Sequence, residues 1–277
     1  MSHVNEGKRD SRRIAPQPTS QGPPYAGLAS GSSRRTYYGY ANFGIVVDEK
    51  LSSSGGRVSP VVQDYVKAVY AVEGRSDGPV GTNALADRLG VTPASVSGML
   101  RKLDELSLVT LTPYHGVQLT EQGRRLALEV MRHHRLIESF LAEQLGMPWD
   151  RVHQEAEVLE HWLSEELEAA IAEKLGQPTV DPHGDPIPTA ELQIDEGSTV
   201  SLESLRPGQQ GILVRVSDSD PEMLRFLAEK GISPGERLEV TEKQPFDGPV
   251  FVRVDGAEVV LGGRLACMMR VEVDPES

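Results

Sequence analysis

The sequence predicts a mainly α protein with an N-terminal winged helix-turn-helix, a second helical domain and a small C-terminal β-barrel. Three observations support this fold class. Apolar residues recur at helical spacing between residues 60 and 175, two short β-type runs follow the third helix, and from Val200 the pattern changes to short β runs separated by glycine and proline. At 277 residues the chain is longer than one core usually supports, about 250 residues, which indicates two or three domains.

Residues 1–57 are rich in Ser, Gly, Pro and Arg and show no sustained period. Such segments bury too little apolar surface to offset the entropy of ordering, so we expect a disordered extension. A tail without a role is the simpler interpretation, although Arg34 and Arg35 leave a basic arm open.

Helix start and stop signals divide the next segment. Ser59 before Pro60 is typical of an N-cap followed by proline at the first helical position, and Thr92 before Pro93 repeats this pattern. Gly90 ends the short amphipathic helix between them. We therefore expect helices at residues 60–73, 82–89 and 93–106, and strands at residues 108–112 and 117–119. Helix, tight turn, helix and then a β-hairpin is the winged form of the helix-turn-helix.

Two longer helices follow. Thr120 begins one that runs to about Leu145, and the next covers about Asp150 to Leu175 with an apolar stripe at helical spacing. The stripe of this second helix consists of Val152, Ala156, Leu159, Leu163, Leu167 and Ala170. Residues 178–199 are proline-rich and irregular, so we interpret them as a linker.

The C-terminal segment, residues 200–277, alternates short β runs with glycine- or proline-bearing turns. The expected strands cover residues 211–216, 237–243, 250–254, 259–261 and 268–273, and one helical patch covers residues 221–230. Several short strands separated by turn signals are typical of a small barrel-like β domain.

Composition limits the function classes. The apolar fraction is 38%, and no apolar run approaches the ~18 residues that a membrane helix needs. Residues 1–35 lack the apolar stretch of a signal peptide. The single cysteine, Cys267, excludes an internal disulfide framework and a thiolate cluster for zinc. We therefore expect a cytoplasmic protein that makes no membrane contact.

The net charge of −13 is unevenly distributed along the chain. Residues 127–196 hold 16 acidic and 4 basic side chains, whereas residues 57–126 hold 7 acidic and 8 basic ones. A strongly acidic segment repels a phosphate backbone and attracts a cation. Cation binding and any contact with nucleic acid would therefore belong to different segments.

The expected helix at residues 93–106 has the side chains of a DNA-reading helix. Its N-terminal end carries small or polar residues that could approach base edges in the major groove, and two basic residues one turn on suit phosphate. These candidates are Thr92, Ala94, Ser95, Ser97, Gly98, Arg101 and Lys102. A three-helix core that binds protein is the alternative. We favour DNA because the hairpin and the serine-rich helix occur together.

A second constellation points to a metal. In the helix from Asp150, a histidine- and glutamate-bearing stripe lies one position beyond the apolar stripe, and the preceding helix adds two more such residues. The set is His134, Glu138, His153, Glu157, Glu160 and His161. Half-buried carboxylates are costly when unpaired, and a bound cation would remove that cost. The alternative is a solvated glutamate face beside an ordinary core histidine.

Enzyme sites with similar ligands are not matched. No His-Glu-x-x-His motif of the zinc proteases occurs. Di-iron bundles use Glu-x-x-His pairs, but Val158 and Met131 stand three residues before His161 and His134. We therefore expect no catalytic activity.

At these positions the sequence resembles the diphtheria-toxin-repressor family of metal-dependent regulators, over roughly residues 58–277. The stretches that carry the resemblance are Tyr65–Tyr70, Ala94–Ser97, Met131–Glu138, Val152–His161 and Pro182–Pro188. The resemblance implies a winged-helix domain at 58–126, a helical dimerisation and metal-binding domain at 127–177, the linker at 178–199 and an SH3-like domain at 200–277. It also implies a homodimer that binds double-stranded operator DNA when loaded with metal.

The resemblance implies two metal sites. By match of position, the primary site would consist of Asp64, Glu157, Glu160 and His161. The ancillary site would consist of His134, Glu138 and His153, with Asp218 as the candidate from the SH3-like domain.

Two departures from the family pattern bear on the metal. Iron-responsive members have Met in place of Asp64 and Cys in place of Glu157, so oxygen replaces sulfur, which favours manganese, with Fe²⁺ as the alternative. Manganese-responsive members also use an acidic residue where this chain has Lys67, so the binuclear site of those members is not expected to carry over. Two further alternatives are a metal-independent winged-helix regulator with a relict site and a metal-buffering protein without DNA function.

Overall fold

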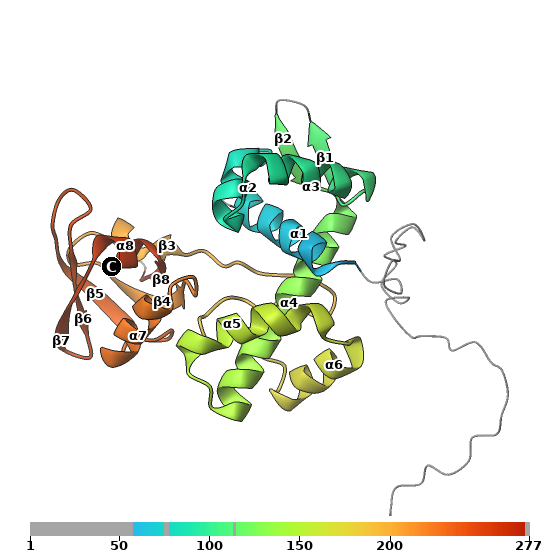
Figure 1. Ribbon diagram of the computed structural model, residues 1–277. Helices are drawn as coiled ribbons and strands as arrows, with labels where there is room; N and C mark the ends of the chain where they lie inside the picture. Colours follow the sequence, from blue (N-terminus) through green and yellow to red (C-terminus); the bar gives the residue numbers. More distant parts are fainter. Residues whose placement is uncertain (1–57, 75–77, 113–114, 275–277) are drawn as a thin grey trace, which may run out of the picture. The chain divides into compact units, whose positions relative to one another are not determined.

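The computed structural model describes residues 58–74, 78–112 and 115–274 (Figure 1). The expected extension at 1–57, with Arg34 and Arg35, and part of the hairpin turn lie outside the described residues. Within the described residues no helix is long and apolar enough to cross a membrane.

The first described domain has the expected order of elements. It consists of α1 (Pro60–Glu73), α2 (Thr82–Leu89), α3 (Pro93–Glu105), β1 (Val109–Thr112) and β2 (Gly116–Leu119). The two strands are antiparallel and form the hairpin at the top of Figure 1. The Thr92 side chain accepts a hydrogen bond from the Ser95 amide at the start of α3, an N-cap worth about 1 kcal/mol. Apolar faces of α1, α2 and α3 meet in one core around Val66, Leu85 and Leu100.

The second helical region begins with the long helix α4 (Glu121–Leu145), which Thr120 caps as expected. Gly123 lets this helix start directly on the hairpin, since a Cβ there would lie 1.9 Å from the Leu108 carbonyl oxygen. The region continues through α5 (Trp149–Leu159), the 3-10 turn η2 (Glu160–Trp162) and α6 (Glu165–Lys174).

The prediction of one continuous helix from Asp150 to Leu175 was therefore wrong. Leu163 is extended, and the Ser164 side chain accepts a hydrogen bond from the Leu167 amide, which begins a new helix. Leu159 and Leu167, expected on the buried stripe, are 44% and 51% exposed. The break at η2 buries Glu160 instead.

The C-terminal domain holds all the expected β runs. Its elements are β3 (Val200–Ser201), η3 (Leu202–Ser204), β4 (Gln210–Val216), α7 (Pro221–Glu229), β5 (Arg237–Lys243), β6 (Val250–Val254), β7 (Ala257–Leu261), α8 (Gly263–Cys267) and β8 (Met269–Val273). They form a six-stranded antiparallel sheet in the order β3-β8-β4-β5-β6-β7. Residues such as Leu213, Leu238 and Val252 build its core.

Two parts of the predicted fold class need correction. The described chain is a mixture of helix and sheet rather than mainly α, because a whole domain is built on the six-stranded sheet. The sheet is also open: β3 and β7 are its edges and do not pair with each other, so no closed barrel forms.

The segment between α6 and β3 contains no helix or regular strand, as expected of a linker, but part of it is packed. Asp181, His183 and Ile187 are buried. The His183 carbonyl accepts a hydrogen bond from the Val216 amide of β4, and Gly184 lies so close to β4 that a Cβ there would be 1.8 Å from the Val214 carbonyl oxygen. This packing brings the end of β4 toward α4 and α5.

Candidate metal centre

The first ligand cluster joins α1 to η2. Asp64, Glu160 and His161 each offer a ligand atom, and these atoms lie within 4.8 Å of one another. His161 Nε2 is 3.2 Å from Asp64 Oδ1 and 3.7 Å from Glu160 Oε1. Asp64 Oδ1 is buried and has no hydrogen-bond partner. The structure thus brings together three of the four residues expected in the primary site.

Glu157, the fourth expected residue, lies in a neighbouring group with His134 and Glu160. Its Oε1 is 3.9 Å from His134 Nδ1 and 3.0 Å from the Lys67 ammonium. Glu157 therefore lies between the two expected sites.

Gln63, which the sequence reasoning missed, fixes the tautomer of His161. Its Oε1 accepts a hydrogen bond from His161 Nδ1 over 2.6 Å, and its own amide nitrogen donates to the Val58 carbonyl. With the proton held on Nδ1, His161 presents the lone pair of Nε2 toward Asp64. The only sequence signal was a polar residue beside Asp64 at a position that turns out to be buried.

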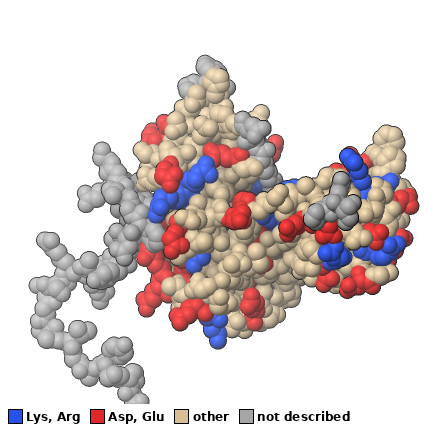
Figure 2. Space-filling view, turned by 180° about the vertical axis from the view of Figure 1, so that it is seen from behind, with Lys and Arg blue, Asp and Glu red and all other residues tan. Residues whose placement is uncertain are grey.

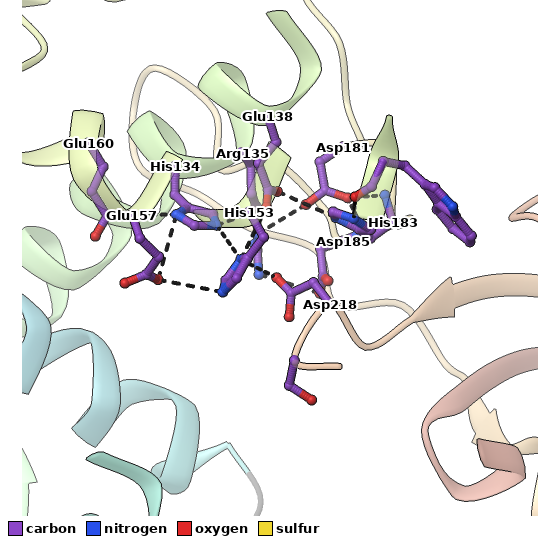
Figure 3. A network of polar contacts seen from close by, with 12 residues as sticks. His134, Arg135, Glu138, His153, Glu157, Glu160, Asp181, His183, Asp185 and Asp218 are labelled. Carbon is purple, nitrogen blue, oxygen red and sulfur yellow. Dashed lines mark hydrogen bonds and ion pairs between the residues drawn. The ribbon is translucent and has the colours of Figure 1, made fainter. Parts of the chain in front are cut away.

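The second cluster joins α4, α5 and the segment after β4. His134, Glu138, His153 and Asp218 offer ligand atoms within 4.8 Å of one another, and they converge in Figure 3. His134 Nε2 is 3.0 Å from Glu138 Oε1 and 3.1 Å from His153 Nδ1, and His153 Nδ1 is 2.9 Å from Asp218 Oδ2. All four residues expected in the ancillary site therefore meet.

His134 also connects the two clusters. Its Nε2 faces the second cluster, while its Nδ1 donates a hydrogen bond of 2.5 Å to Glu160 Oε2. The other carboxylate oxygen of Glu160 faces His161 of the first cluster. The His134 imidazole and the Glu160 carboxylate therefore form a continuous polar connection between the two clusters.

The buried charges shift the pKa values of the second cluster. Burial alone would lower the pKa of His134, but Glu138 and the hydrogen bond to Glu160 outweigh it and raise the pKa to about 9. Burial opposes the charged form of His153 as well, yet Asp218 and Glu138 raise its pKa to about 10. In return His134 holds the pKa of Glu138 well below its ordinary value, against the effect of burial.

His183 from the linker is the other residue that sequence reasoning missed. Its Nε2 donates to the Trp149 carbonyl over 2.7 Å, and its Nδ1 points toward Glu138 Oε2 at 3.6 Å (Figure 3). Both of these facing atoms are buried and lack a hydrogen-bond partner. In the sequence, the stretch around His183 resembles the family's linker and shows no other signal of this role.

The donor set fits a divalent cation. Carboxylate oxygens and imidazole nitrogens converge in both clusters, and no sulfur donor takes part in the groups found among the described residues. Asp64 Oδ1 and Glu138 Oε2 are buried without a hydrogen-bond partner, and their lone pairs could coordinate a cation. Such a site suits first-row divalent metals that accept oxygen and nitrogen.

The DNA-reading candidates lie at the start of α3. Six of them, Thr92, Ala94, Ser95, Gly98, Arg101 and Lys102, are exposed, and Ser97 is half-buried. Thr92 and Ser95 hydrogen-bond each other, and the Ser97 hydroxyl donates to the Pro93 carbonyl. The Ser97 proton and one of the two hydroxyl protons of Thr92 and Ser95 are used in these bonds, and the other of those two hydroxyls can still donate. Serine and threonine hydroxyls can pair with donors or acceptors on a base edge, so they discriminate bases weakly.

Acidic side chains are prominent on the other helices. Several gather at the lower left of Figure 2. The first turn of α6 alone holds Glu165, Glu166 and Glu168. This surface repels phosphate, so α3 and the hairpin remain the part of the described chain suited to DNA. A winged helix joined to buried histidine–carboxylate clusters defines a class: DNA-binding regulators that respond to a metal.

Comparison with known proteins places the chain within that class. Family models match three segments: the N-terminal DNA-binding domain of iron-dependent repressors at residues 57–117, their metal-binding and dimerisation domain at 120–189, and the FeoA domain at 200–273. The chain belongs to the diphtheria-toxin-repressor family of metal-dependent transcriptional repressors, which are not enzymes.

Individual relatives agree over most of their length. The iron-dependent repressor IdeR of Mycobacterium tuberculosis is 31% identical over 220 residues, covering 75% of this chain and 95% of the relative. The diphtheria toxin repressor of Corynebacterium efficiens is also 31% identical, covering 75% and 93%. A solved manganese-dependent transcriptional repressor in complex with manganese is 44% identical, with a TM-score of 0.72, and covers 76% of this chain and 99% of its own.

Proposed function

We propose that this protein is a manganese-responsive repressor that acts in the cytoplasm. It would bind operator DNA as a homodimer when its sites are loaded, and would control genes of metal-ion homeostasis. The observation that carries the proposal is that Asp64, on α1 of the DNA-binding domain, shares a ligand cluster with Glu160 and His161 of the metal-binding domain.

The cluster would couple metal to DNA through the packing of α1. Helix α1 shares its core with α3, so fixing Asp64 against Glu160 also fixes the DNA-reading helix. A divalent ion bound there would supply the positive charge that holds these carboxylates together. Two α3 helices of a dimer reach successive major grooves only at a separation of about 34 Å, so fixing their angle selects the DNA-binding arrangement.

The donor chemistry supports manganese as the physiological ion. Asp64, Glu157 and Asp218 are hard oxygen donors, which suit Mn²⁺ better than the softer Fe²⁺. The 44%-identical structure is that of a manganese-dependent repressor, whereas the 31%-identical IdeR is an iron-dependent repressor. Fe²⁺ is therefore the alternative that any test must include.

An exposed apolar surface supports the homodimer. Val158, Leu159, Trp162 and Leu167, on α5, η2 and α6, are 64%, 44%, 63% and 51% exposed. Exposed large apolar side chains are typical of protein interfaces, and these four fall within ten residues of sequence. They lie within the segment that matches the dimerisation domain.

Fluorescence anisotropy of labelled DNA from upstream of metal-transport genes tests the proposal. Chelator-treated protein is titrated with Mn²⁺, anaerobic Fe²⁺ or Zn²⁺ separately. We expect DNA binding that appears with Mn²⁺ and reverses with chelator. Equal DNA binding with and without metal would remove the switch, and metal binding without DNA affinity would favour a metal-buffering protein.

Asp64→Ala tests the coupling itself. The variant removes the only ligand of the first cluster that comes from α1, so metal-dependent DNA binding is expected to be lost while the dimer persists. Glu143→Ala, which removes an exposed carboxylate near the end of α4, is the matched control. If Asp64→Ala kept its DNA affinity with Mn²⁺, the coupling model would fail.

A further inference from the structure

A lysine ammonium already occupies part of the first cluster. Lys67 follows Asp64 by almost one turn of α1, and its Nζ lies 2.6 Å from Glu160 Oε1 and 3.0 Å from Glu157 Oε1. The Lys67 side chain is 19% exposed and that of Glu160 is fully buried. A positive charge thus sits between two carboxylates that were predicted to bind a metal.

The contact differs from an ordinary surface salt bridge. Surface pairs contribute little, but a buried carboxylate oxygen without a partner is costly. Lys67 therefore stabilises Oε1 of Glu160 when no metal is near, while His134 contacts Oε2. The oxygen of Glu160 that Lys67 contacts is also the one that faces His161 Nε2 at 3.7 Å. An ammonium and a metal ion would therefore draw on the same lone pairs.

The charge count points the same way. With His134 and His161 neutral, Asp64, Glu157 and Glu160 carry three negative charges when ionised, and Lys67 offsets one of them. One divalent ion beside the ammonium would neutralise the cluster, whereas a second divalent ion would leave it positive. Lys67 thus limits how many divalent ions the carboxylates can hold.

We propose that Lys67 is an internal cation that competes with divalent metal for Glu157 and Glu160. It thereby raises the metal concentration at which the first cluster fills and restricts that cluster to one ion. This inference rests on the proposed metal-responsive function, in which the first cluster is the switch. The side chain also links α1 to α5 and η2 before metal binds, since its two partners lie on those elements.

Direct measurement of Mn²⁺ binding tests the proposal without DNA. Apo protein is titrated with MnCl₂ by isothermal calorimetry, and equilibrium dialysis with elemental analysis gives the number of ions per protomer. Replacing Lys67 by Met removes the charge and keeps most of the volume. We expect the Mn²⁺ affinity of the first cluster to rise about tenfold or more, which is the order expected for removing a charge a few ångströms away.

Lys67→Arg is the matched control, because it keeps the charge and should leave the affinity near that of the unchanged protein. Asp64→Ala combined with Lys67→Met assigns the effect to the first cluster, since the gain in affinity should shrink when Asp64 is absent. Lys67→Gln serves as a second neutral variant, and circular dichroism checks that each variant is folded.

The outcomes separate this inference from the proposed function. If the unchanged protein binds no Mn²⁺, the proposed function fails. If it binds Mn²⁺ but folded Lys67→Met and Lys67→Gln bind it equally or more weakly, the competing role of Lys67 is wrong while the proposed function stands.

Discussion

Single residues beyond the ligands decide how the clusters present their atoms. His161 offers Nε2 to Asp64 because Gln63 holds its other nitrogen, and Gln63 is oriented in turn by the Val58 carbonyl. Partners of this kind typically contribute about 10–100-fold to metal affinity. Gln63 is therefore a positioning residue of the first cluster.

Gln63→Leu removes the acceptor and frees the imidazole of His161 to rotate or change tautomer. We expect Mn²⁺ affinity at the first cluster to fall about tenfold or more, measured by calorimetry. Gln63→Glu keeps an acceptor at the same place and should restore most of the affinity. Equal affinities of Gln63→Leu and the unchanged protein would show that His161 needs no such support.

The residues that sequence could and could not predict differ in a physical way. Glu138 and His153 stand at helical spacings, so periodicity placed them on half-buried helix faces, whereas Asp64 was assigned through the family resemblance. Gln63 and His183 lack such a pattern, because each depends on a contact that only the folded chain creates. Gln63 is oriented by the Val58 carbonyl just before α1, and His183 by the packing of the linker against Trp149. Glu157 was assigned to a single site, but side-chain directions put it between the two clusters.

At the scale of elements, the predicted helix starts were reliable because caps are local. The Thr92 and Thr120 side chains cap the helices that follow them, and Ser59 occupies the N-cap position of α1 without a side-chain hydrogen bond. The break at η2 was missed, since the histidine–glutamate stripe and the apolar stripe both continue through it at helical spacing. The break matters for the site, as it turns Glu160 inward to meet His134 and Lys67.

The linker acts as a structural element in its own right. Gly184 has φ +87°, and a Cβ there would collide with the Val214 carbonyl of β4. The ion pair between Asp185 and Arg215, at 3.3 Å, holds the same two segments together. Since Asp218 follows β4 closely, the linker positions this ligand opposite His153.

Gly184→Ala should separate the linker from β4. We expect Mn²⁺ affinity at the second cluster to fall at least tenfold, and resistance of the linker to proteolysis to drop, because Asp218 loses its support. Gly197→Ala is a matched control: it has a similar φ of +64° but open space around it. The strain of a left-handed alanine, about 1–2 kcal/mol, is common to both variants, so an equal loss in both would point to strain rather than to linker contact.

For the whole molecule, the histidines connect metal binding to pH. In the metal-free protein the pKa values of His134, His153 and His183 lie at about 9, 10 and 9, because Glu138 and its neighbours outweigh burial. A histidine whose pKa is raised by folding adds its full contribution to the free energy of unfolding below about pH 6.5, its unfolded pKa. That contribution is lost as the pH rises through the pKa of the folded state. In the metal-free protein, protons on these histidines therefore supply the positive charge beside the carboxylates that a bound metal ion would otherwise supply.

Mn²⁺ binding at His134 and His153 requires deprotonated nitrogens, so each ion that binds must release protons. At pH 7.5 we expect release of at least about one proton per protomer, obtained from calorimetry in two buffers with different ionisation enthalpies. The rise in melting temperature on adding Mn²⁺ should also be larger at pH 8.5 than at pH 6.5. The sign follows from competition: fewer protons must be displaced at higher pH, and the stability that protonation gives the metal-free protein is already declining there.

The His153→Gln variant should release fewer protons, because one of the raised pKa values is gone. A rise in melting temperature that is equal at both pH values, with no proton release, would mean that the histidines do not bind the ion.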